Sequence, residues 1–209
     1  MIDTPLYLTF VIAALALCVT PGPDMMFVVA MGGRGGPVSG VMAALGVAFG
    51  AMVHALAAML GLSSLFAHLP VLYEVLRWAG ASYLVYLAVQ ALRDRSSLVG
   101  GDDGPAPAGR LRAFAKGAVT NLLNPKVIMF NIAFLPQFVN PDRGSVTGQL
   151  LVLGLTLVVV GLAVDATVGV LSGRLAALLR NSRRVARGLD VFSGAAFGAL
   201  AVRLVTASD

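Results

Sequence analysis

The stretch Thr20-Pro21-Gly22-Pro23-Asp24 decides the fold of this chain, because it places helix breakers and a carboxylate inside an otherwise apolar segment. Two prolines remove two backbone donors, so the carbonyls of Leu17 and Val19 lose their usual helical partners. At membrane depth such a break is tolerated only where it is buried against protein or lines a wet cavity. An acidic residue at that depth marks a functional site by default. The stretch therefore predicts a broken membrane helix with a site at its break.

The composition indicates an integral membrane protein. Of the 209 residues, 58% are hydrophobic and 12% are charged, and the mean hydropathy is +0.87. A soluble domain of this size needs more charge on its surface. At about 20 residues per span, the chain has room for roughly six helices and no extramembrane domain. Its single cysteine excludes an intramolecular disulfide and any paired-cysteine redox or metal motif, and we expect neither a cofactor nor a bound metal.

Six spans are predicted, and the basic residues orient them. The spans cover residues 5–31, 38–62, 70–92, 114–138, 146–172 and 187–206. Most basic residues follow the first, third and fifth spans: Arg34; Arg93, Arg95, Arg110, Arg112 and Lys116; Arg174, Arg180, Arg183, Arg184 and Arg187. The net charge of +5 is thus a topology signal rather than a sign of nucleic-acid binding. The positive-inside rule places these loops in the cytoplasm and both termini outside.

The chain divides into two similar halves. A Gly- and Pro-rich stretch within residues 96–112 predicts a flexible cytoplasmic linker between a repeat at 1–95 and a repeat at 113–209. Pro23-Asp24 in the first half matches Pro125-Lys126 in the second, and glycines of later spans match in the same order. Repeats of three spans are inverted relative to one another, which is a common transporter architecture with its site at the repeat interface. We predict an all-α membrane protein of two inverted three-helix repeats, with helices 1 and 4 broken.

The second break contains Asn121, Asn124, Pro125 and Lys126. Asn124 is a candidate N-cap with Pro125 at the first helical position, as Gly22 caps a half-helix that begins at Pro23. Unwound residues before each half-helix, Thr20 among them, offer free carbonyls.

These groups suggest how a zwitterion could be bound. We expect Asp24 to hold an ammonium or a proton, Lys126 to hold a carboxylate, and Asn121 to orient either group. The alternative is that Asp24 and Lys126 pair and join the two halves. Asp165, in the fifth span, either relays protons or extends toward the Arg-rich loop. His54 is interpreted as a hydrogen-bonded packing residue, and glycines 40, 46, 50, 148, 154 and 161 as close-packing positions.

Four motifs together resemble the LysE/RhtB family of amino-acid exporters. The matching residues are Thr20-Pro21-Gly22-Pro23-Asp24, Gly61-Leu62, Gly80-Ala81-Ser82-Tyr83-Leu84 and Asn121-Leu122-Leu123-Asn124-Pro125-Lys126. The resemblance covers essentially the whole chain. It implies a six-helix carrier of the bacterial inner membrane that uses the proton gradient to export amino acids. Members of that family export homoserine, threonine, leucine and related neutral amino acids, or lysine and arginine.

The first hypothesis is therefore a secondary active exporter of neutral amino acids and not an enzyme. Its expected partners are the substrate, protons and the lipid bilayer. A lining of Asp24, Asn121, Asn124 and Lys126 leaves no surplus acid for a cationic side chain, although Asp165 could overturn that preference. Alternatives in the same superfamily are exporters of basic amino acids and of cadmium, a soft ion that favours sulfur ligands. A non-transporting membrane scaffold subunit is the alternative from another class. A homodimer is left open.

Overall fold

The structure is a computed structural model that describes residues 3–68 and 109–181, together with single helical residues in two further segments. Those residues are 75, 78, 82, 85, 86, 89, 187, 188, 191, 192, 194, 195, 198, 199, 201 and 202. Most of the predicted third and sixth spans, and the linker up to residue 108, lie outside the described residues. Every regular element within the described ranges is a helix.

The first break is present where the prolines predicted it. Helix α1 covers Thr4–Val19 and begins with the Asp3 side chain accepting from the Leu6 N–H at 3.3 Å. Thr20 is extended, with ψ 122°, and ends the helix. Helix α2, Pro23–His68, starts at the second proline, and the Gly22 carbonyl accepts from the Met26 N–H at 2.9 Å. Pro23 therefore takes the first helical position, as predicted.

Helix α2 contains both the end of the first predicted span and all of the second. It reverses at Gly36, the non-helical residue, whose φ of 78° is readily adopted only by glycine. Pro37 then opens the returning segment. The sequence predicted a loop between residues 31 and 38. That prediction is wrong in length, because the chain reverses at a single glycine with positive φ.

The second break is also present. Helix α4 covers Arg110–Leu122 and α5 covers Pro125–Met129, and the Asn124 side chain caps α5 by accepting from the Lys126 N–H at 3.0 Å. Asn124 is extended because the following proline disfavours the helical conformation. Since α4 begins at Arg110, residues 110–112 of the predicted linker are helical and the fourth span starts earlier than predicted.

Beyond α5 the fourth span departs from regular α-helix. A π-helix, η2, covers Phe130–Phe134, and 3-10 helices η3 and η4 cover Leu135–Phe138 and Pro141–Arg143. Pro136 cannot donate to the α-helical ladder. The Asn131 side chain donates to the Val127 carbonyl at 2.9 Å and so inserts into the same ladder. Helix α6, Val146–Asn181, follows.

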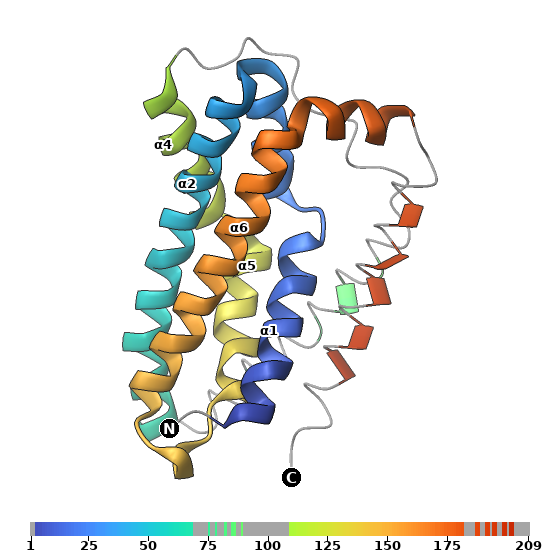
Figure 1. The fold of residues 1–209 in the computed structure, drawn as a ribbon. Coiled ribbons are helices and arrows are strands. Elements are labelled where there is room, and N and C mark those ends of the chain that lie inside the picture. Colours follow the sequence, from blue (N-terminus) through green and yellow to red (C-terminus); the bar gives the residue numbers. More distant parts are fainter. Residues whose placement is uncertain are drawn as a thin grey trace.

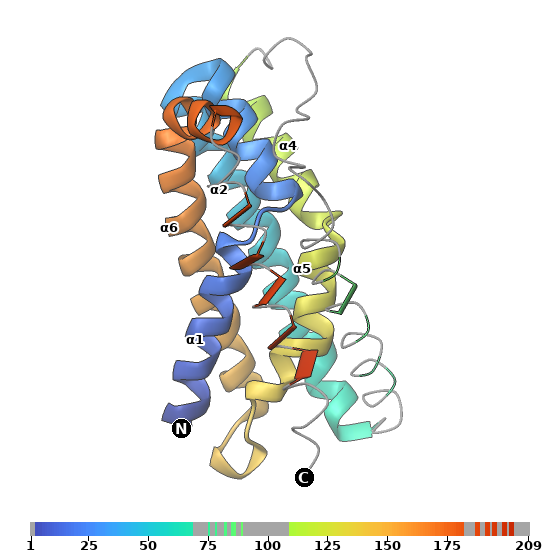
Figure 2. The same ribbon diagram turned by 90° about the vertical axis from the view of Figure 1, so that its right-hand side faces the viewer.

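The two breaks face each other at the middle of the bundle (Figures 1 and 2). The chain passes through the first break in one direction, from α1 into α2, and through the second in the opposite direction, from α4 into α5. The returning part of α2 packs between α4 and α6, and α1 packs against α6. This antiparallel arrangement brings Asp24 and Lys126 to the same level.

Glycines allow the helices to approach closely, as the sequence predicted for positions 40, 46, 50 and 154 but not for 148, where a Cβ atom would meet only the nearby Ser145. A Cβ atom on Gly46 would clash with the Phe114 carbonyl, and one on Gly117 with the Ala43 carbonyl, so α2 and α4 touch through their backbones. Gly40 meets Gly169 of α6 in the same way, and Gly154 meets Ala55. Close contacts of this kind are typical of helix packing in membranes.

The outer surface of the bundle is apolar. Ile12 is 69% exposed and Val159 is 66% exposed, and large apolar side chains recur along the outward faces of α1, α2 and α6. Within the described residues, Pro23–Gly61 and Val146–Ser172 are long and apolar enough to cross a membrane, and Thr4–Val19 is a shorter apolar helix. Apolar surface of this extent is typical of a face that contacts lipid or another protein.

We expect Gly46→Ala to destabilise the fold by about 1–3 kcal/mol, because the added methyl group forces α2 away from the Phe114 carbonyl. The measurement is the apparent melting temperature in detergent. Gly61→Ala is the matched control, since a Cβ atom there meets nothing within 4 Å. Equal melting temperatures for the two variants would contradict the close approach.

Candidate functional site

The ammonium group of Lys126 completes the first break. Its Nζ atom donates to the carbonyl of Leu17 at 3.0 Å and to the carbonyl of Thr20 at 3.0 Å. The Leu17 carbonyl is one of the two that were predicted to lose a hydrogen-bond donor because of the prolines. The second acceptor is Thr20 rather than Val19. A cation from one half of the chain thus replaces two backbone donors in the other half.

The carboxylate of Asp24 in turn completes the second break. Its Oδ2 atom accepts from Asn121 Nδ2 at 2.9 Å and from Asn124 Nδ2 at 2.8 Å. Asn124 uses both ends of its amide, because its Oδ1 atom caps α5. Asn121 is 2% exposed and Asn124 is 1% exposed, so these charge-assisted bonds are formed away from water.

Asp24 and Lys126 do not pair with each other among the described side chains, although the sequence allowed for it. Each charged group is held instead by polar groups of the opposite break. Lys126 passes directly over Gly22, where a Cβ atom would lie 3.1 Å from Nζ. Glycine at this position therefore leaves room for the lysine as well as capping the half-helix.

Two buried oxygen atoms at the site lack hydrogen-bond partners. They are Asp24 Oδ1 and Asn121 Oδ1, and both accept hydrogen bonds only. A buried carboxylate or amide oxygen without a hydrogen-bond partner is costly. Two such oxygens at the same site therefore suggest that a hydrogen-bond donor binds there. Gly50 makes this possible, since a side chain there would collide with Asn121. His54 contacts the Asn121 carbonyl at 3.3 Å, which confirms its predicted hydrogen-bonded role.

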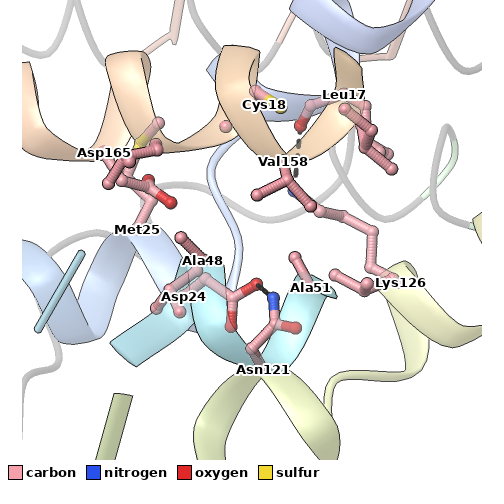
Figure 3. Close-up of a pocket in the computed structure, with 15 residues that line it drawn as sticks. Leu17, Cys18, Asp24, Met25, Ala48, Ala51, Asn121, Lys126, Val158 and Asp165 are labelled. Carbon is pink, nitrogen blue, oxygen red and sulfur yellow. Dashed lines mark hydrogen bonds between the residues drawn. The ribbon is translucent and has the colours of Figure 1, made fainter. Parts of the chain in front are cut away.

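A cavity of about 50 Å³ lies between the breaks, which is room for a few water molecules (Figure 3). Its polar lining consists of Asp24, Asn121, Lys126 and Asp165. Its remaining lining is Leu17, Cys18, Met25, Val47, Ala48, Ala51, Val127, Leu157, Val158, Gly161 and Leu162. The cavity thus combines both signs of charge with a largely apolar wall.

The structure separates the predicted site residues into three groups. Asp24, Asn121, Lys126 and Asp165 line the cavity. Asn124 and the Thr20 carbonyl support the charged groups from behind, and the Thr20 hydroxyl bonds to the Ala16 carbonyl at 2.6 Å. The four helix-breaking residues, Pro21, Gly22, Pro23 and Pro125, shape the two breaks.

Asp165 lies at the cavity wall and is 8% exposed. The side chains of Arg174, Arg180, Arg183 and Arg184 in the Arg-rich loop, to which it was predicted to extend as one of two alternatives, lie outside the described residues. Sequence reasoning missed Cys18 and the apolar lining contributed by α6. Small residues recur in the fifth span, and this pattern could have indicated that Gly161 lines a cavity. The same pattern is equally well explained by close helix packing. A Cβ atom on Gly161 would lie 3.6 Å from the Cys18 sulfur.

Apolar clusters lie on both sides of the cavity. Toward the N-terminus, Phe10 packs with Phe130, Phe134 and Phe138, and the Phe10 and Phe138 ring centroids are 5.2 Å apart. At the other end of the bundle, Val28, Met31, Ala43, Ala44, Val47 and Ala113 form a second cluster. The cavity therefore lies between two apolar clusters, midway between the ends of the bundle.

The sequence model of the LysE type translocators matches residues 15–208. This chain belongs to that family. It is 34% identical to an uncharacterized membrane protein of Pseudomonas aeruginosa, over 96% of this chain and 94% of the relative. It is 32% identical to a leucine efflux protein of Klebsiella pneumoniae, over 96% and 94%. It is 27% identical to a homoserine/homoserine lactone efflux protein of Salmonella typhimurium, over 96% of each chain.

Membership makes the protein a membrane translocator and not an enzyme. No solved structure matches the chain. Among the described residues, no three His, Cys, Asp or Glu side chains gather into a group that could hold a metal ion. Because the family consists of translocators, the two broken helices and the cavity between them are a candidate transport site.

We expect Lys126→Met to lower the apparent melting temperature in detergent, because the Leu17 and Thr20 carbonyls lose their donor at a cost of about 1–3 kcal/mol each. Lys116→Met is the matched control, since Lys116 is an exposed lysine of α4. A melting temperature that is the same for both variants would mean that Lys126 does not hold the first break together.

Proposed function

We propose that this protein is a secondary active exporter of neutral amino acids, driven by protons, whose substrate binds in the cavity between the two helix breaks. The observation that carries the proposal is an unpartnered carboxylate oxygen, Asp24 Oδ1, in the same small cavity as the ammonium group of Lys126. The family match supports transport, and the names of two relatives support amino-acid efflux.

The polar groups match the backbone of an amino acid. A lysine ammonium has three N–H donors, and Lys126 uses two of them on the first break, so one is left for a substrate carboxylate. Asp24 Oδ1 and Asn121 Oδ1 are acceptors for a substrate ammonium. A zwitterion would thus gain a partner for each charge while the bonds that hold the breaks stay in place.

The apolar wall favours an uncharged side chain. Val47, Ala48, Val158 and Leu162 line the cavity beside the polar groups, and they suit an aliphatic or short polar side chain. A bound substrate would displace the few water molecules for which this cavity has room. Asp165 is the group through which a basic amino acid could instead be accommodated, which makes basic substrates the competing proposal.

The antiparallel breaks suggest how access alternates. We infer two inverted repeats of three spans each, residues 1–95 and 113–209, that rock about the cavity in the bacterial inner membrane with both termini outside. Opening the phenylalanine cluster would expose the site to the outside, and opening the opposite cluster would expose it to the cytoplasm. The irregular π and 3-10 backbone of the fourth span supports movement on the phenylalanine side, because π-helical segments frequently occur at functional sites.

The test is transport by purified protein in proteoliposomes with an imposed pH gradient, using labelled leucine, homoserine, threonine, lysine and arginine, and cadmium. We expect the neutral amino acids to be moved, and Asp24→Asn to reduce their transport at least about tenfold, because a charge-assisted bond to the ammonium is lost. Asp142→Asn is the matched control, since Asp142 is an exposed carboxylate outside the cavity.

The outcomes separate the alternatives. Transport of lysine and arginine alone would replace the neutral substrates by basic ones, and transport of cadmium alone would replace amino acids by a metal ion. If a folded and inserted protein moved none of these compounds, the breaks would be a structural joint and the scaffold reading would stand.

A further inference from the structure

The cavity contains two carboxylates with different surroundings. Asp24 and Asp165 are each 8% exposed, and both line the cavity wall. The Oδ2 atom of Asp24 accepts two amide N–H bonds, so only Oδ1 remains available. Asp165 receives no hydrogen bond and forms no ion pair with the part of the chain that the structure describes. The two acids are therefore suited to different ligands.

The geometry at Asp24 suits an ammonium group. A cation placed at Oδ1 leaves both amide bonds intact, and Asn121, which is hydrogen-bonded to the same carboxylate, carries a second unpartnered oxygen. More than one unpartnered acceptor suits an ammonium group, which has three donors, whereas a proton needs only one acceptor.

The surroundings of Asp165 suit a proton. The ionisable groups that face it across the cavity are the Cys18 thiol from α1, Asp24 from α2 and Lys126 from α5. The charged residues of α4, Arg110, Arg112 and Lys116, are exposed and do not line the cavity. Lys126 is committed to the first break, and Asp24 has the same charge as Asp165. Without a donor directed at it, a buried carboxylate is most easily accommodated as the neutral acid.

We propose that the two carboxylates divide the work of exchange, with Asp24 binding the ammonium group of the substrate and Asp165 carrying the proton that is exchanged for it. The inference rests on the proposed function and assigns each cation its own site. The substrate ammonium offsets the negative charge of Asp24, the like charge that opposes ionisation of Asp165, whereas the substrate carboxylate goes to Lys126, a cation already committed to two backbone carbonyls. The ammonium therefore favours the ionised form of Asp165 and releases its proton. By reciprocity, a proton on Asp165 weakens ammonium binding. One proton is bound and one released in each cycle.

The experiment compares two assays in proteoliposomes for the wild type, Asp165→Asn, Asp165→Glu and Asp24→Asn. The first assay is accumulation of labelled leucine driven by a pH gradient. The second is exchange of labelled for unlabelled leucine at equal pH on both sides, which needs no net proton movement. We expect Asp165→Asn to lose gradient-driven accumulation completely, so that the internal and external concentrations become equal, while exchange stays within about threefold of the wild type.

Asparagine keeps the size and shape of the side chain but cannot release a proton. Like the protonated acid it weakens ammonium binding, so exchange is measured at a saturating concentration of leucine, at which weaker binding does not limit the rate. Asp165→Glu restores a titratable group and is expected to recover accumulation. Asp24→Asn is expected to lose both activities, because the substrate ammonium has no site.

Three results would overturn the assignment. Gradient-driven accumulation by Asp165→Asn would mean that another group carries the proton, although the exporter itself would stand. Loss of both activities in Asp165→Asn, with an unchanged melting temperature, would make Asp165 a substrate-binding residue. Failure of the wild type to move any amino acid in the panel would instead remove the proposed function, and the division of roles with it.

Discussion

Crossed binding between two helix breaks is the interaction on which the rest of this structure depends. Lys126 of the second break supplies donors to carbonyls of the first, and Asp24 of the first supplies an acceptor to amides of the second. Backbone groups freed by proline cannot be left unpaired in an apolar environment, and a buried charge needs polar partners. Each break satisfies the requirement of the other, so the two halves must meet at this level and in antiparallel order.

The close approach of the helices follows from that constraint. For a lysine and an aspartate to reach across, the segments that hold them must lie near one another, and glycines at the α2–α4 and α2–α6 contacts permit this. Gly22 and Gly50 serve the site directly, the first below Lys126 and the second beside Asn121. The two residues that carry unpartnered oxygen atoms then line a cavity that has an apolar cluster on either side.

Much of this site was visible in the order of residues. Prolines end helices wherever they occur, and Asn124 and Gly22 begin half-helices through contacts with residues two to four positions away. These are local effects, so both breaks were predicted at the correct residues. The same locality explains two errors. A single glycine with positive φ reversed the chain where a longer loop was expected, and Pro136 with Asn131 converted the end of the fourth span to π and 3-10 helix. In both places a few residues determined which local backbone conformation formed.

The tertiary structure decided how the charges are used. The sequence allowed Asp24 and Lys126 to pair, and it allowed Asp165 either to reach a loop or to serve the site. The hydrogen bonds that hold Asp24 and Lys126 join residues about 100 positions apart, such as Lys126 with Thr20, and they depend on the depth at which each helix lies against its neighbour. The place of Asp165 at the cavity wall depends on the same packing. No residue pattern encodes that depth by itself, because it results from all the helix contacts together. The prolines, caps and apolar runs therefore specified where the helices break, whereas packing alone specified which polar atoms were left without partners.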